Sequence, residues 1–358
     1  MNTLARYLTT QVLIAMSFVL LALLVLFAFF DMIQELGQVG HNNYGLPQMT
    51  LFILLSIPGH IYEILPVAAL IGTMFALTRL VKNSEYSVMR VSGLSNWRVA
   101  LYFSLLGSAL SLTILVLGEY VSPKSEQAAQ RLRLTATQSV VAQQFRSGFW
   151  VKDGHTFINV REVMPNNHLA DVNIYEFDDE GHLELIRRAD QAIWKKGTQS
   201  WNLMNVLETR FSADGVRTNA VPMLSWHTVL SQDMLGVLLV APEKMSARTL
   251  YNYVDHLQKN GQKAGRYEIA LWAKFIAPFA IPVMMLLAMP FALQKPRTGG
   301  ANNMTFIGIL AGLGFHLLNR LFGHLGLLND WPPFAVTSLP LLVFLGLALI
   351  SIRWVDRR

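Results

Sequence analysis

The chain alternates between long apolar runs and short polar connectors. The first run, residues 7–30, has 24 positions without a charge, and about 20 helical residues are enough to cross a hydrocarbon core of about 30 Å. Similar runs lie at about residues 49–80, 99–118, 269–293, 304–322 and 334–354. The pattern therefore predicts six membrane-spanning helices in two groups of three.

A region between the two groups has a different period. From about residue 145 to residue 240, short stretches rich in β-branched and aromatic residues alternate in part with polar residues. Turn-forming residues separate them at Asp153-Gly154, 178–181, Lys196-Gly197 and Asp214-Gly215. Short strands at this spacing are typical of an antiparallel sandwich or jelly-roll. The predicted fold class is an α-helical membrane protein with six transmembrane helices (3+3) and an inserted antiparallel β-jelly-roll domain.

Two further helices are predicted beside the β region. One is expected to begin at Ser122-Pro123, where a capping serine precedes a proline in the first turn. The other covers residues 246–260 and ends at Gly261. The predicted domains are residues 1–121 with the first three spans, 122–265 with the β domain and its flanking helices, and 266–358 with the last three spans.

The charges predict how the spans are oriented. Ten Lys and Arg side chains lie in the connectors and tails that we assign to the cytoplasm, against only Glu85 and Asp356, and such an excess marks cytoplasmic connectors. Both termini are therefore expected in the cytoplasm and the β domain outside it. Arg6 precedes the first run and no small-residue cleavage site follows, so this run is expected to remain as a span.

The connector at residues 79–98 combines basic charge with a short helix of its own. Ser84 is expected to cap this helix, with Glu85 in its first turn, and Gly93 is expected to end it. Val88, Met89 and Val91 give it an apolar side. A capped amphipathic helix of this size at the cytosolic surface is typical of a docking element.

Composition excludes several other functions. Apolar residues make up 53% of the chain and charged residues only 15%, which is low for a soluble domain. The net charge of +6 does not indicate nucleic-acid binding, because residues 122–265 hold 16 basic and 15 acidic residues. The chain has no cysteine, no phosphate-binding loop, no H-E-x-x-H and no G-x-S-x-G motif. We therefore expect no cofactor, no metal site and no enzymatic activity.

Several polar residues in or near the spans have two interpretations. His316, Arg320 and His324 share one helical face, which faces either an internal cavity or, for Arg320, the lipid headgroups. Pro58, Glu63 and Pro66 in the second run mark either a substrate pathway or a kinked interfacial helix.

Two charged positions outside the spans are equally open. Arg131 and Arg133 form either a phosphate-binding pair or a solvated helix face. Glu85 is either a first-turn acid of its helix or an ionic partner for another chain.

Four sequence stretches resemble those of a known family. They are SEYSVMRVSG at residues 84–93, GEYVSP-x-x-E-Q at 118–127, NGQKAGRYEIALWAKFIAP at 260–278, and the MMLLAMPFAL that follows. Together with the 3+3 layout, they are similar to the lipopolysaccharide-export permeases over essentially the whole chain. Of the two subunit types that pair in this family, F and G, the match is closer to the G type.

This resemblance implies a permease subunit of an ABC transporter in the bacterial inner membrane, with its β domain in the periplasm. Such a transporter extracts lipopolysaccharide from the inner membrane and passes it to a periplasmic bridge toward the outer membrane. The implied partners are a second homologous permease subunit of the F type, a cytosolic ATPase dimer, a single-span bitopic bridge protein and lipopolysaccharide. The residues expected to contact the ATPase are Glu85, Met89, Arg90 and Gly93.

The resemblance also implies a substrate path between spans. The residues expected along it are Arg131, Arg133, His316, Arg320, Asp31 and Gln34. Relatives have lysines at the outer end of the first span, whereas this chain has Asp31, Gln34 and Glu35 and no lysine there. Arg320 is a hypothetical replacement for those lysines. The alternatives are an ABC permease for lipoprotein or another envelope lipid, an envelope-assembly scaffold without transport, and a membrane-bound hydrolase, which lacks a nucleophile–base set.

Overall fold

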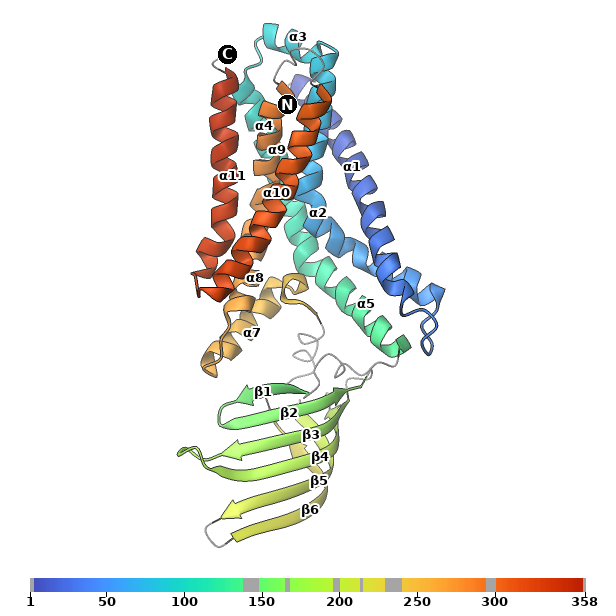
Figure 1. Cartoon of the computed structure of the whole chain (residues 1–358), viewed down its shortest axis with the longest axis vertical. Coiled ribbons are helices and arrows are strands. Elements are labelled where there is room, and N and C mark those ends of the chain that lie inside the picture. Colours follow the sequence, from blue (N-terminus) through green and yellow to red (C-terminus); the bar gives the residue numbers. More distant parts are fainter. Residues whose placement is uncertain are drawn as a thin grey trace.

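The computed structural model describes residues 3–137, 148–164, 168–195, 200–212, 215–228, 240–293 and 301–356. For residues 301–305 and 356 it describes the backbone alone. Figure 1 shows long helices at one end of an elongated molecule and a β-sheet at the other. The helical elements are α1 (Thr3–Leu36), α2 (Leu46–Lys82), α3 (Glu85–Val91), α4 (Asn96–Val116), the π-helical turn η1 (Leu117–Val121), α5 (Ser122–Thr137), the 3₁₀ turn η3 (Pro242–Lys244), α7 (Ala247–Lys259), α8 (Gly265–Ile276), the 3₁₀ turn η4 (Ala277–Phe279), α9 (Ala280–Leu293), α10 (Ala301–Leu328) and α11 (Pro333–Asp356).

Six helical stretches are long and apolar enough to cross a membrane, which confirms the predicted spans. Three of them, α1, α2 and the continuous α4–η1–α5, precede the β-sheet, and α8–η4–α9, α10 and α11 follow it. α10 extends to Leu328. His324 therefore lies within that helix, beyond the predicted end of the fifth span at about residue 322.

α2 and α9 form the centre of the helical bundle. Nearly every side chain of α9 is buried, and so are most side chains of α2 from Ile64 to Leu80. α1 and α10 lie at the rim, where large apolar side chains such as Phe18 and Leu317 are exposed. A helix that is apolar on all sides is stable in lipid, so the exposed apolar surface of the rim is consistent with a membrane.

Small residues allow the helices to cross closely. A Cβ atom on Gly72 of α2 would lie 2.5 Å from the Cα atom of Met16 in α1, and one on Gly107 of α4 would lie 2.6 Å from the Cα atom of Pro282 in α9. Interfaces between membrane helices favour such residues, because van der Waals contact replaces the hydrophobic drive.

The helix expected to begin at Ser122 does not begin there. Ser122 has helical backbone angles, and the π-helical turn η1 joins α4 to α5 without a break. Pro123 has no N–H group and would interrupt a regular helix. The π-helical turn, whose hydrogen bonds span one more residue, lies directly before this proline. The serine–proline pair therefore marks a change of helical pitch and not a helix start.

The six strands form one antiparallel sheet in sequential order. They are β1 (Phe149–Asp153), β2 (Thr156–Val163), β3 (Leu169–Phe177), β4 (Leu183–Lys195), β5 (Ser200–Ser212) and β6 (Gly215–Trp226). This confirms the inserted antiparallel domain, with each described strand paired to its neighbour in sequence. Alternate residues are buried in one core, including Ile158 and Val160 of β2 and the fully buried Trp201 of β5.

Two of the predicted turns connect strands as expected. Gly154 has φ +59° in the β1–β2 turn, and Gly181 has φ +86° in the β3–β4 turn, where glycine is favoured. The other two turn signals, Lys196-Gly197 and Asp214, lie outside the described residues, as do the basic residues of 294–300 and the last two arginines.

We expect Gly72→Ala to destabilise the bundle by about 1–3 kcal/mol, because the added methyl group would overlap the backbone of α1. Thermal unfolding of the purified protein in detergent measures this change. Gly314→Ala is the matched control, since no atom lies within 4 Å of a Cβ at that helical glycine. Equal melting temperatures for the two variants would contradict the close crossing of α1 and α2.

Candidate functional site

The short helix α3 lies at the end of the bundle opposite the β-sheet (Figure 1). Its start differs from the sequence expectation. Ser84 adopts a left-handed conformation with φ 61°, and its side chain makes no capping hydrogen bond. α2 ends at Lys82, so the chain reverses within two residues, and this turn requires the left-handed conformation. The predicted end is confirmed, because Gly93 has φ +93° and its N–H group donates to the carbonyl of Arg90.

One face of α3 packs against the bundle and the other is exposed. Tyr86 and Met89 are buried, and the Tyr86 hydroxyl donates to the Asn96 side chain of α4 over 2.7 Å. Val88 and Val91 are 65% and 91% exposed. Met89, expected as a docking contact, therefore faces the interior. The two valines form the exposed apolar side of α3. The i, i+3 spacing of Tyr86 and Met89 is a sequence signal that these two residues share the other face.

Glu85 connects α3 to the first helix. The Tyr7 hydroxyl of α1 donates to its carboxylate over 2.7 Å, and Asn83 donates to its other oxygen over 3.2 Å. These hydrogen bonds, that of Tyr7 above all, lower the pKa of Glu85 from its usual value. The carboxylate thus remains charged and is already hydrogen-bonded within the chain. Arg90, in the last turn of α3, is exposed.

A buried acid occupies the other end of the bundle. Glu35 of α1 is 5% exposed, accepts a hydrogen bond of 2.8 Å from the Tyr44 hydroxyl, and lies 3.5 Å from the Arg133 guanidinium of α5. Burial and the bond to Glu35 raise the pKa of Tyr44. Arg133 also lies over the ring of Phe52. Arg133 is far from Glu35 and Tyr44 in the sequence, so no local pattern indicates this cluster.

The other substrate residues expected near this end are separate. Asp31 pairs with His60 of α2 over 2.6 Å, whereas Gln34 and Arg131 have exposed side chains. Arg131 and Arg133, two positions apart on α5, thus differ in environment. Only Arg133 has an acidic partner within ion-pair distance among the described residues.

α10 packs against α2 through glycines. Gly308 lies against Met74, and Gly312 lies against Leu70 and Val67. One turn further along, His316 is half-buried and within electrostatic reach of Glu63 of α2 and of Arg320. Arg320 and His324 are exposed. α10 therefore places one titratable group against α2 and two at its surface.

A polar joint links the bundle to α7, the helix that returns from the β domain. The Glu119 carboxylate of η1 accepts hydrogen bonds from the backbone N–H groups of Ala247, over 2.7 Å, and Arg248, over 3.2 Å. Both groups belong to the first turn of α7, where an acid also complements the helix dipole. The buried Glu126 of α5 bonds to Lys244 over 3.0 Å. Two acids of the third span thus hold the start of α7.

A second part of this joint surrounds Lys274 of α8. This side chain is only 8% exposed, and its Nζ atom lies 4.4 Å from the centre of the Tyr62 ring of α2. No hydrogen-bond partner of Nζ occurs among the described residues. A cation over an aromatic face gains electrostatic energy. A Cβ on Gly118 would lie 2.4 Å from the same ring, so Tyr62 fills the space that this glycine leaves.

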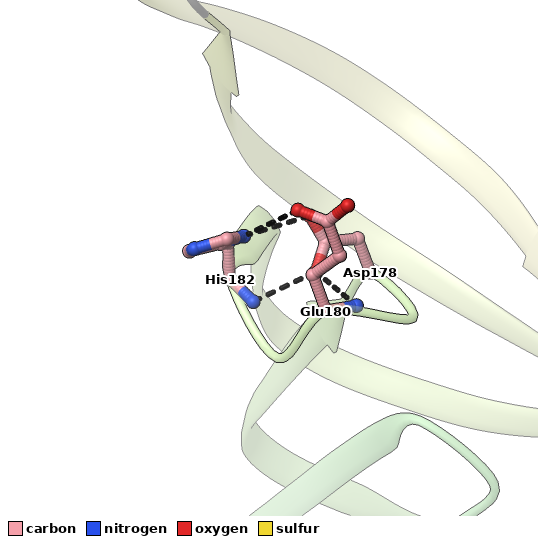
Figure 2. Close-up of side chains that lie close together, drawn as sticks. All are labelled: Asp178, Glu180 and His182. Atoms are coloured by element: carbon pink, nitrogen blue, oxygen red, sulfur yellow. Dashed lines mark hydrogen bonds and ion pairs between the residues drawn. The ribbon is translucent and has the colours of Figure 1, made fainter.

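Asp178, Glu180 and His182 gather at the β3–β4 turn, as Figure 2 shows. Asp178 accepts hydrogen bonds from the backbone N–H groups of His182, over 2.7 Å, and Glu180, over 3.0 Å, and these bonds lower its pKa. Glu180 and His182 are exposed. The turn therefore accounts for the position of these residues without a metal ion.

Comparison with known proteins shows to which family the chain belongs. A family described as lipopolysaccharide export system permease LptF/LptG matches residues 6–354. The chain belongs to the LptF/LptG family. A Haemophilus influenzae protein named lipopolysaccharide export system permease protein LptG is 31% identical over 359 residues, which cover 100% of this chain and 99% of the relative. A protein of the same name from Escherichia coli K12 is 30% identical, with 97% of both chains covered.

Three of the four sequence stretches that resemble the LptF/LptG family include residues of these clusters. The stretch at 84–93 is α3 with its two turns, the stretch at 118–127 contains Glu119 and Glu126, and the stretch at 260–278 contains Lys274. The fourth stretch, MMLLAMPFAL, lies in the buried helix α9.

We expect Glu119→Ala to increase opening of the first turn of α7, because two backbone N–H groups lose their acceptor. Hydrogen exchange at the amides of Ala247 and Arg248 should become about tenfold faster, which corresponds to about 1.4 kcal/mol. Glu243→Ala is the control, since this exposed acid lies in the adjacent turn η3 and 3.8 Å from Arg266. The role of Glu119 would be refuted by unchanged exchange in its variant.

Proposed function

We propose that this permease is one subunit of a transporter that extracts lipopolysaccharide from the inner membrane and passes it to a periplasmic bridge toward the outer membrane. The observation that carries the proposal is α3. It is a short helix at the end of the bundle opposite the β-sheet, with its buried face bonded to α4 and an apolar face left exposed. Such a helix is suited to a groove in another protein.

The proposed orientation follows the charge asymmetry. Both chain ends lie at the same end of the bundle as α3 (Figure 1), and the basic connectors favour the cytoplasm for that end. The β domain then lies in the periplasm. We divide the chain into residues 1–121 with three spans, 122–265 as the periplasmic unit, and 266–358 with the remaining spans.

The proposed partners follow from the surfaces. A cytosolic ATPase dimer, which supplies the hydrolysis, would bind α3 through Val88, Val91 and Arg90, with Glu85 and Gly93 fixing the shape of the helix. A second homologous permease of the F type would lie beside the apolar faces of α1 and α10. The largely exposed edge strand β6 suits pairing with a single-span bridge protein, because an edge strand has free backbone groups.

The substrate would pass between the first span of one subunit and the fifth span of the other, which are α1 and α10 in this chain. Lipopolysaccharide combines acyl chains with phosphates, so a path for it needs apolar walls and cations at the outer rim. Arg320 and Arg131 are exposed and free to contact phosphate, while Glu35 partly neutralises Arg133. We assign His316, Asp31 and Gln34 to the same path. The hypothesis that Arg320 replaces the missing lysines is consistent with its exposure.

Val91→Asp should abolish binding of the ATPase, because a charge would replace the most exposed apolar side chain of α3 without touching its buried face. Co-purification from native membranes with mass spectrometry of bound proteins and lipid checks this expectation. Glu85→Ala and Gly93→Pro should also weaken binding by altering the position of the helix.

Val216→Asp is the matched control, since it places the same charge at an exposed valine of β6. It should leave the ATPase bound. If the wild-type protein co-purifies with no ATPase, or with bulk phospholipid as its only lipid, the transport proposal is excluded. The envelope scaffold would then be favoured.

Arg320→Gln should reduce cross-linking of lipopolysaccharide to a photoreactive residue at position 317 of α10 about fivefold, because one cation near a lipid surface contributes about 1 kcal/mol. His324→Gln, one turn away, leaves the Arg320 cation in place and should change the cross-linking little. Cross-linking that is the same in wild type and in Arg320→Gln would rule out the replacement hypothesis.

A further inference from the structure

A groove lies between α2 and α10 at the α3 end of the bundle. Its volume is about 440 Å³, which is in the range of about 300–1,000 Å³ of sites that bind small ligands. It is lined by Phe75, Thr78, Arg79, Lys82, Asn83, Phe306 and Ile309. None of these residues belongs to the docking face of α3 or to the substrate path.

The lining divides into an apolar part and a basic part. Phe75, Phe306 and Ile309 are 52%, 61% and 41% exposed, so a large apolar surface is open to whatever fills the groove. Arg79 and Lys82 lie in the last turn of α2, at the boundary between the apolar span and its polar connector. The groove therefore presents apolar and cationic groups to one ligand.

The two cations are not neutralised by the chain around them. Neither has an ion-pair partner among the described residues, and the lining contains no acid. The charge of Arg79 does act on Glu85. However, that carboxylate is hydrogen-bonded to Tyr7 and Asn83. Anionic groups are thus attracted to the basic part.

We propose that this groove binds an anionic phospholipid, whose phosphate contacts Arg79 and Lys82 and whose acyl chain lies along Phe75, Phe306 and Ile309. The position at a span end, where headgroups lie, matches this chemistry better than a soluble anion, which would leave the apolar part exposed. With the orientation proposed above, the lipid belongs to the cytoplasmic leaflet, which contains anionic lipids.

A bound lipid would connect two helices that move relative to each other if the transporter changes shape. α2 continues into the turn that holds α3, and α10 lies at the rim of the bundle. Because the ligand contacts both helices, it would stabilise the arrangement in which they enclose the groove.

The test uses the intact transporter, purified in nanodiscs that contain phosphatidylglycerol and phosphatidylcholine. Native mass spectrometry after release into mild detergent counts the lipids that remain bound. We expect wild type to retain phosphatidylglycerol in preference to phosphatidylcholine. The double variant Arg79→Gln, Lys82→Gln should retain about one tenth as much phosphatidylglycerol as wild type, or less. The double variant Arg6→Gln, Arg98→Gln removes the same charge from exposed positions outside the groove and should retain it.

Ile309→Trp separates the groove from general surface charge. It fills the apolar part and keeps both cations, so it should also release phosphatidylglycerol. Melting temperatures of all variants show whether they fold. The proposal is overturned if Ile309→Trp retains the lipid as wild type does, if the two double variants lose equal amounts, or if a photoreactive residue at position 306 cross-links to protein or lipopolysaccharide instead.

These readouts do not depend on transport. A preparation that retains phosphatidylglycerol but no ATPase would contradict the proposed function and support the lipid site. A wild-type preparation that retains the ATPase but shows no preference for phosphatidylglycerol would support the proposed function and contradict the lipid site.

Discussion

A hydrocarbon medium offers no hydrogen-bond partner to the backbone, and most of this structure follows from that constraint. It requires continuous helices, and it makes each proline inside a span a point where a carbonyl group loses its donor. Pro282 has no N–H group to donate to the carbonyl of Pro278, and the Ser111 hydroxyl of α4 donates to that carbonyl. Gly107, one turn earlier, lets the backbone of α9 come close enough for this bond. The close approach of α4 and α9 at this crossing thus provides both tight packing and a hydrogen-bond donor for the carbonyl of Pro278.

The same constraint explains why the charged side chains gather at the two ends of the bundle. At one end, Glu85 bonds to α1 and Tyr86 bonds to α4, so α3 is fixed to two spans. At the other end, Glu119 and Glu126 hold the start of α7. One continuous helical stretch, Asn96–Thr137, runs from the contact with α3 to the joint with α7. Tyr86 of α3 and the start of α7 thus contact the same helical stretch.

The acidic residues at the end of the first span have a structural explanation. Glu35 is buried and bonded to Tyr44 and Arg133, and Asp31 is bonded to His60. In this chain the acids serve to join α1, α2 and α5. A cation shared with a buried acid binds an added phosphate less strongly, because the nearby carboxylate repels it. Substrate contacts in this subunit would then shift to cations without such partners, such as Arg131 and Arg320.

The sequence by itself determined the spans, their grouping around the β domain, and the existence of α3 and α7. These features depend on the length and period of local apolar patterns, which a chain displays without folding. The tertiary structure alone decided that Ser122 continues a helix and that Glu35 meets Arg133. The first depends on the π-helical turn that joins α4 to α5, and the second on the approach of the end of α1 to α5. Local patterns contain no information about such contacts, because the partner of a buried charge is selected by packing.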